Sequence, residues 1–75
     1  MNDIDTSNIT DMSYLFEYTD FNGDISNGNV SNVTNMKFMF ANSNFNGDIS
    51  NWDVSNVIHK LYIFDNCQIK EKYKP

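Results

Sequence analysis

The chain has 75 residues and a mass of 8.7 kDa, which allows one small domain and excludes separate catalytic and regulatory domains. Ten acidic residues against five lysines and no arginine give a net charge of −5, which argues against sequence-independent binding to nucleic acid. No apolar run approaches the ~20 residues of a membrane span, and residues 1–20 lack the basic start and apolar stretch of a signal peptide.

Stability is the first physical problem for so short a chain. A domain of this size buries only ~60% of the surface that its unfolded form exposes. The single cysteine, Cys67, cannot form an internal disulfide, and together with the single histidine, His59, it does not make a zinc site. With 40% hydrophobic residues the composition is too apolar for a disordered chain, so we expect stability to come from repetition or from a partner.

The sequence contains an internal repeat. Residues 6–29 and 30–53 are identical at 12 of 24 paired positions, and a third copy begins at Val54 and then diverges. A period of this length is typical of a solenoid, in which each unit buries its apolar face against its neighbours. We therefore predict a single repeat domain over residues 1–75, with coils 6–29, 30–53 and 54–69 and a basic tail at 70–75.

Each repeat is predicted to hold a short helix followed by a short strand. In the second repeat, apolar residues from Val33 to Phe40 recur at helical spacing and predict a helix of at most two turns. The next polar residues favour a turn, residues 45–50 favour a short strand, and Gly47 is expected to ease a tight bend. Alternating side chains over 51–55 indicate an extended return. The predicted fold class is thus α/β, a solenoid of about three coils.

The register also predicts which side chains form the core. Positions that stay apolar in successive repeats are expected to stack as buried columns, whereas positions that differ are expected to face solvent. The aromatic columns 14/38/62 and 16/40/64 could form a ligand-stacking strip, but helical spacing favours a core role for them. The expected outward pairs are Ser13/Lys37, Glu17/Ala41 and Tyr18/Asn42, and the expected core columns are Ile9/Val33/Val57, Met12/Met36, Leu15/Met39/Ile63, Phe16/Phe40/Phe64, Phe21/Phe45/Ile69 and Ile25/Ile49.

Asparagine is the second feature of the repeat. Thirteen asparagines occur in the chain, and several hold the same place in each copy, as do Asn8, Asn32 and Asn56. In stacked coils such amides can bond to one another and to turn backbone across the ~4.8 Å strand spacing. The alternative is that each asparagine only accommodates a turn, because its side chain bonds locally and tolerates positive φ.

The acid-rich turns raise the question of a cation site. Asp20, Asn22 and Asp24 alternate as oxygen ligands do in a calcium loop, and the pattern recurs at residues 44–48. No bidentate glutamate follows at the required distance, so carboxylates that accept backbone N–H groups in turns are the simpler interpretation. We predict no metal site and no cofactor.

Two long runs carry a family resemblance. They are Ile-Ser-Asn-Trp-Asp-Val-Ser-Asn-Val at 49–57 and Val-Ser-Asn-Val-Thr-Asn-Met-Lys-Phe-Met-Phe at 30–40. Together they resemble the bacterial surface-protein repeat of about 25 residues, which is similar to BspA-type leucine-rich repeats. The resemblance spans roughly residues 3–66 and implies a leucine-rich-repeat-like solenoid used for adhesion or protein binding at cell surfaces. Gly28 and Lys60 depart from the pattern, in which tryptophan and methionine are expected.

A catalytic role is not predicted. Cys67 and His59 lie eight residues apart, and no third residue that would orient such a pair can be identified. In the repeat register Cys67 takes the place of Thr19 and Ser43, so a small side chain that fills a turn explains it more simply.

The predicted function is a non-enzymatic protein-binding repeat module, and the alternative is a structural component that docks by the ends of the solenoid into a larger particle or oligomer. The expected partner is a protein or a second copy, without nucleic acid and without membrane insertion. The candidate partner-binding residues are Tyr18, Lys37 and Asn42.

Charge differs along the chain: residues 1–59 hold eight acids and one lysine, a net of −7, and residues 60–75 hold four lysines and two acids, a net of +2.

Overall fold

The computed structural model describes residues 7–75, and this part of the chain contains very little regular secondary structure. Its helix is the short 3₁₀ helix η1 (Glu71–Tyr73), and its strand pairing consists of isolated parallel bridges that join Asp11 to Asn35 and Asn35 to His59. The predicted α/β, leucine-rich-repeat-like solenoid is therefore wrong. Neither the helix expected over 33–40 nor the strand expected over 45–50 forms.

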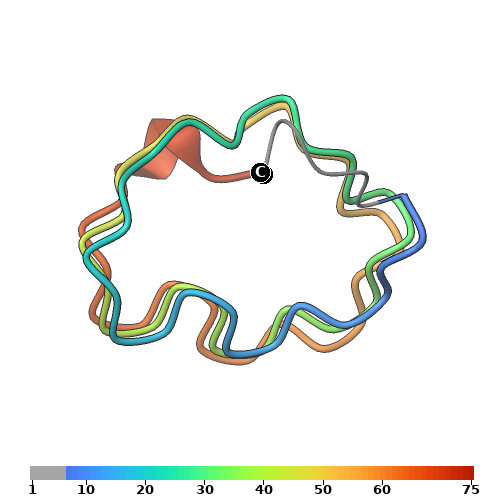
Figure 1. The fold of residues 1–75 in the computed structure, drawn as a ribbon, viewed down its shortest axis with the longest axis horizontal. Helices are drawn as coiled ribbons and strands as arrows, with labels where there is room; N and C mark the ends of the chain where they lie inside the picture. The colour runs from blue at the N-terminus through green and yellow to red at the C-terminus, as the bar shows by residue number, and fades with distance from the viewer. Residues whose placement is uncertain (1–6) are drawn as a thin grey trace.

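Irregular loops of chain lie over one another instead. Figure 1 shows successive passes of the chain following the same outline, so that segments one repeat apart lie side by side. Backbone hydrogen bonds join the passes: the N–H of Met12 donates to the carbonyl of Asn35 at 2.8 Å, and the N–H of Met36 donates to the carbonyl of His59 at 2.8 Å. The sequence repeat is thus a structural repeat made of turns.

Segment 12–18 shows how turns satisfy the backbone without a helix. Its even-numbered residues, from Met12 to Tyr18, donate their N–H groups to carbonyls of the second repeat, at 2.8–3.1 Å. Leu15 and Glu17 donate back to carbonyls three residues earlier, and Ser13 donates to the carboxylate of Asp11. Every N–H of the segment is therefore bonded, alternately across to the next repeat and back into its own loop.

Left-handed backbone at two places in each repeat explains why the chain turns. Tyr14 and Tyr18 have φ values of 63° and 59°, and Phe38 and Asn42 have φ values of 59° and 56°. A residue with positive φ at the third position of a four-residue turn reverses the chain. Such turns bring apolar side chains back to one side every three or four residues, which is also the spacing of a helix face. Val33, Met36 and Phe40, whose spacing predicted a helix, are buried in this segment of turns without one.

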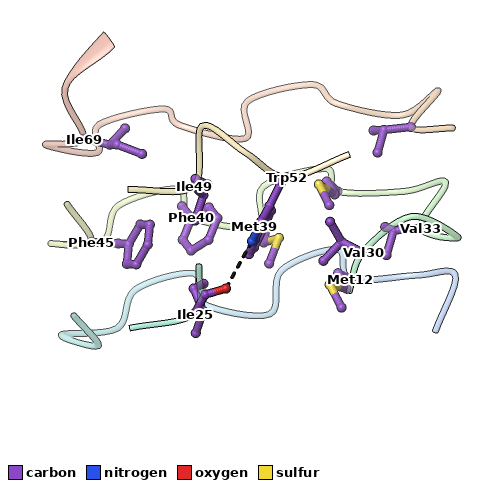
Figure 2. Packing of buried hydrophobic residues seen from close by; sticks show 12 residues of the cluster. Met12, Ile25, Val30, Val33, Met39, Phe40, Phe45, Ile49, Trp52 and Ile69 are labelled. Atoms are coloured by element: carbon purple, nitrogen blue, oxygen red, sulfur yellow. Dashed lines mark hydrogen bonds between the residues drawn. The ribbon is translucent and has the colours of Figure 1, made fainter. Parts of the chain in front are cut away.

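Apolar side chains fill the inside of the loops (Figure 2). Phe40 is fully buried, and its ring stacks on those of Phe16 and Phe64 with centroids 5.4 Å and 5.8 Å apart. These contacts confirm the predicted 16/40/64 core column. Trp52, which the core prediction did not include, is also buried, and its indole Nε1 donates to the carbonyl of Ile25 at 3.1 Å.

Asparagine side chains link neighbouring repeats, mainly through backbone groups. The amide of Asn56 donates to the carbonyl of Ser31 at 2.7 Å, and the amide of Asn32 donates in the same way to the carbonyl of Ser7. An amide-to-amide bond joins Asn66 to Asn42 at 3.0 Å. Asn32 and Asn56 therefore each close a polar contact between two loops as well as accommodating their own turns.

The hydrogen bonds carry the repeat register past Ile69 into the basic tail. The N–H of Lys70 donates to the side-chain oxygen of Asn46 at 3.1 Å, and the N–H of Asn46 donates to that of Asn22 at 2.9 Å. The carbonyl of Tyr73, one repeat after Ile49, accepts the N–H of Ile49 at 3.0 Å. The tail thus continues the third loop as far as η1.

Gly47 is required by packing and not by a bend, because it does not have a positive φ. A Cβ at this position would lie 2.7 Å from Cζ of Phe45, which is fully buried and stacked on Phe40 with centroids 4.5 Å apart. The ring cannot move away without disturbing the core. We expect Gly47→Ala to lower the free energy of unfolding by about 1–3 kcal/mol, measured by urea denaturation.

Gly23 provides the matched control for this prediction. A Cβ there would lie 2.8 Å from Cζ of Phe21, but Phe21 is only partly buried, so its ring can move toward solvent. Gly23→Ala should therefore destabilise the protein less than Gly47→Ala. Equal losses for the two variants would contradict the role assigned to the buried ring.

Candidate functional site: an exposed aromatic strip

A column of aromatic rings lies on the outside of the stacked loops. The rings of Tyr14 and Phe38 are stacked with centroids 5.1 Å apart and an interplanar angle of 7°, and the ring of Tyr62 follows at 5.2 Å from Phe38. Tyr14 is 48% exposed and Tyr62 is 53% exposed, whereas Phe38 between them is partly buried. We call these three residues the aromatic strip.

The assignment of the 14/38/62 column to the core was wrong. In each loop the backbone of this segment is held so that the phenylalanine of the 16/40/64 column points inward, while the aromatic residue two positions earlier has its ring on the surface. An aromatic residue at positive φ in each of the three repeats is unusual, because left-handed backbone disfavours bulky side chains. The sequence signal for the exposed column was its two-residue spacing from the 16/40/64 column. When the chain turns between two such positions, their rings lie on opposite sides of it.

Other exposed apolar side chains belong to the same stacked segments. Tyr18 is 76% exposed and Leu61, next to Tyr62, is 58% exposed. Lys37 lies over the strip, with its Nζ 5.9 Å from the centroid of the Tyr14 ring. The surface therefore combines apolar rings with one cation placed for a cation–π contact.

The three predicted partner-binding residues have different environments. Tyr18 is exposed, Lys37 is partly buried against the strip, and Asn42 is partly buried with its side-chain oxygen accepting the amide of Asn66. The expected outward position of Ala41 was wrong, because Ala41 is fully buried. A small side chain at this position packs beneath the surface while its neighbours on the chain face outward.

Cys67 has the surroundings of a turn residue. Its thiol donates to the carbonyl of Phe45 at 3.3 Å and lies 3.7 Å from the hydroxyl of Ser43, which precedes it by one repeat. The hydroxyls of Thr19 and Ser43 each donate to a carbonyl three residues earlier at 2.8 Å. His59, by contrast, is exposed at the end of a parallel bridge.

The acid-rich turns form a polar hollow of about 400 Å³ between residues 22–26 and 46–48. The carboxylate of Asp24 accepts the backbone N–H and the hydroxyl of Ser26, and these bonds hold the pKa of that carboxyl below its ordinary value of 3.8. The hydroxyl and N–H of Ser50 lower the pKa of Asp48 in the same way. These carboxylates act in turns, and among residues 7–75 no three His, Cys, Asp or Glu side chains gather as metal ligands would.

Comparison with known proteins gives a family and no function. No curated protein and no solved structure matches the chain. Among the described residues no helix is long and apolar enough to cross a membrane. The match to a family of proteins extends over residues 1–72, nearly the whole sequence. The chain therefore belongs to the family described as "Mycoplasma protein of unknown function, DUF285".

Proposed function

We propose that this protein is a non-enzymatic protein-binding module and that the aromatic strip is the centre of its binding surface. The observation that carries the proposal is the exposure of Tyr14 and Tyr62 in a column of contacting rings. Single exposed apolar residues are ordinary on protein surfaces, whereas a contiguous apolar patch marks an interaction site. Tyrosine is enriched at such sites because it offers a large, rigid contact area with a polar tip.

The rigidity of the strip supports the same function. Tyr14, Phe38 and Tyr62 are fixed by left-handed turns, and the N–H groups of Tyr14 and Phe38 bond to the following repeat, so a partner would meet rings that are already in place. A preorganised surface loses less conformational entropy on binding. Adhesion is the use that the resemblance to surface-protein repeats suggests.

Tyr18, Lys37 and Asn42 fit this surface as surrounding contacts. Tyr18 adds an exposed ring four residues after Tyr14, and Lys37 supplies the only positive charge of the first two repeats. A charge at the edge of an interface changes mainly the association rate and its salt dependence. Substitution of Lys37 is therefore expected to matter less at equilibrium than substitution within the strip.

Docking by the ends of the stack is the second candidate function. Ile9 and Leu15 belong to predicted core columns, yet they are 37% and 46% exposed in the first repeat. Their counterparts Val33 and Met39 in the second repeat are fully buried. Assembly with another protein or a second copy through such a face would bury this apolar surface.

A selection of peptide ligands tests the first proposal. Random peptides displayed on phage are selected on the wild-type protein, and their affinities are then measured by calorimetry on the double variant Tyr14→Ser, Tyr62→Ser. We expect a loss of about 10-fold or more, because truncation of central aromatic residues removes at least ~1.4 kcal/mol of binding free energy.

The matched control is the double variant Asn51→Ser, Gln68→Ser, which changes two exposed residues outside the strip. It should retain the affinity of the wild type. Selected peptides that bind the two double variants equally well, with both variants folded, would refute a binding surface on the strip.

A further inference from the structure

Asparagine is followed directly by glycine at three places in the chain, residues 22–23, 27–28 and 46–47. This pair is prone to cyclisation, because glycine has no Cβ to shield its backbone nitrogen from the asparagine side chain. The first and third pairs lie in identical segments, 21–26 and 45–50, which both read Phe-Asn-Gly-Asp-Ile-Ser. Any difference in reactivity that vanishes when the chain unfolds must therefore come from the fold.

Two of the three pairs combine an unbonded glycine nitrogen with a hydrogen-bonded side-chain oxygen. Oδ1 of Asn22 accepts the backbone N–H of Asn46 at 2.9 Å, and Oδ1 of Asn46 accepts the backbone N–H of Lys70 at 3.1 Å. In the part of the chain that the structure describes, the N–H groups of Gly23 and Gly47 have no acceptor. A backbone N–H held at such an oxygen stabilises negative charge that develops on it, as the donors of an oxyanion hole do.

The Asn27–Gly28 pair lacks both features. The N–H of Gly28 donates to the carbonyl of Ile25 at 3.1 Å, and no N–H of the described residues donates to the side-chain oxygen of Asn27. The equivalent turn of the second repeat, from Ile49 to Trp52, is closed in the same way at 3.0 Å. The difference between the two kinds of turn thus belongs to the repeat itself.

We propose that the pairs at 22–23 and 46–47 are sites of covalent self-modification, at which asparagine converts into aspartate and isoaspartate while Asn27 stays intact. The glycine nitrogen forms a bond to Cγ of the asparagine, and negative charge passes to Oδ1. The Cγ–Nδ2 bond then breaks, and ammonia leaves with the proton of the glycine N–H, which gives a succinimide ring. Water opens the ring at either carbonyl, so each site gains a carboxylate without any oxidant or enzyme. This proposal does not depend on the aromatic strip.

The products would change the polar hollow that these turns line. Water reaches the hollow, and each new carboxylate would join those of Asp24 and Asp48 there. The isoaspartyl product also inserts a methylene into the main chain, which at the second site lies next to the fully buried Phe45. Modification is therefore expected to make the hollow more acidic and to loosen the packing of the second repeat.

Incubation of the folded protein at mildly alkaline pH, followed over time by peptide mass spectrometry, tests the proposal. We expect Asn22 and Asn46 to react about 10-fold or more faster than Asn27, because only they combine a free nucleophile with a donor to the developing charge. In urea, where no fold holds the chain, the three sites should react at similar rates. Electron-transfer fragmentation distinguishes isoaspartate from aspartate in the products.

Lys70→Pro tests the hydrogen bond to Oδ1 of Asn46. Lys70 has a φ of −74°, which proline adopts, so the substitution removes the N–H donor with little change of the backbone. Asn46 should react about 3- to 10-fold more slowly in this variant, whereas Asn22 in the same molecule should react as in the wild type. Lys70→Ala keeps the N–H and is the matched control, in which both rates should stay unchanged.

Three results would overturn the proposal. The first is a folded protein in which Asn27 reacts as fast as Asn22 and Asn46. The second is a folded protein in which Asn22 and Asn46 stay intact while the chain in urea is modified. The third is an equal rate at Asn46 in Lys70→Pro and Lys70→Ala, since the N–H would then contribute nothing to the reaction.

Discussion

Phe40→Ala is expected to lower the free energy of unfolding by about 3–5 kcal/mol, as the loss of a large ring from a packed core does. Phe40 is fully buried and contacts rings on both sides in the stack, those of Phe16 and Phe64, as well as Phe45 at 4.5 Å. No neighbour can fill the space without breaking its own stacking. The free energy of unfolding of a small domain is ~5–15 kcal/mol in total. This variant should therefore be largely unfolded or should melt at a much lower temperature than the wild type.

Differential scanning calorimetry measures the effect, and Phe64→Ala is the matched control. Phe64, in the third repeat, makes the same kind of contact with Phe40 but is only partly buried. Phe64→Ala should therefore lower the free energy of unfolding clearly less than Phe40→Ala. A Phe40→Ala protein that melts within a few degrees of the wild type would show that the core does not depend on this column.

The repeat and the 16/40/64 column could be predicted from the sequence because they depend only on the spacing of identical residues. Phe16, Phe40 and Phe64 hold the same place in three successive repeats and do stack. The secondary structure could not be predicted in the same way. Apolar residues at Val33, Met36 and Phe40 fit a helix, but the N–H groups of Met36 and Phe40 donate to carbonyls of the next repeat, and no local propensity contains that information.

The aromatic strip was missed for a related reason. Left-handed backbone is typical of glycine and asparagine. Asn42 and Asn66 therefore indicate it at the second of the two left-handed positions in each repeat. At the other position the residue is Tyr14, Phe38 or Tyr62, for which sequence rules give no expectation of positive φ. The conformation becomes understandable once the hydrogen bonds between repeats are known, because they offset a strain of about 1–3 kcal/mol per residue.

Trp52 shows how one side chain can join two repeats. Its N–H groups point in two directions: the backbone N–H closes a turn on Ile49 at 3.0 Å, and the indole N–H reaches Ile25 in the preceding repeat at 3.1 Å. In the first repeat the equivalent position is Gly28, so the second repeat alone, among the described residues, carries this link. Among residues 7–75, this kind of link between repeats is therefore made by one indole.

Trp52→Ala is accordingly expected to lower the free energy of unfolding by about 3–5 kcal/mol, because it leaves a cavity between the first two repeats. Trp52→Phe retains an aromatic ring next to Phe40 but removes the donor to Ile25, whose carbonyl keeps the N–H of Gly28. One lost hydrogen bond and a partly filled site should cost about 1–2 kcal/mol. Calorimetry suits both variants, because it does not depend on the tryptophan fluorescence that they have lost. Equal losses would mean that the hydrogen bond, not the volume of the ring, stabilises the junction, and the packing argument for Trp52 would then fail.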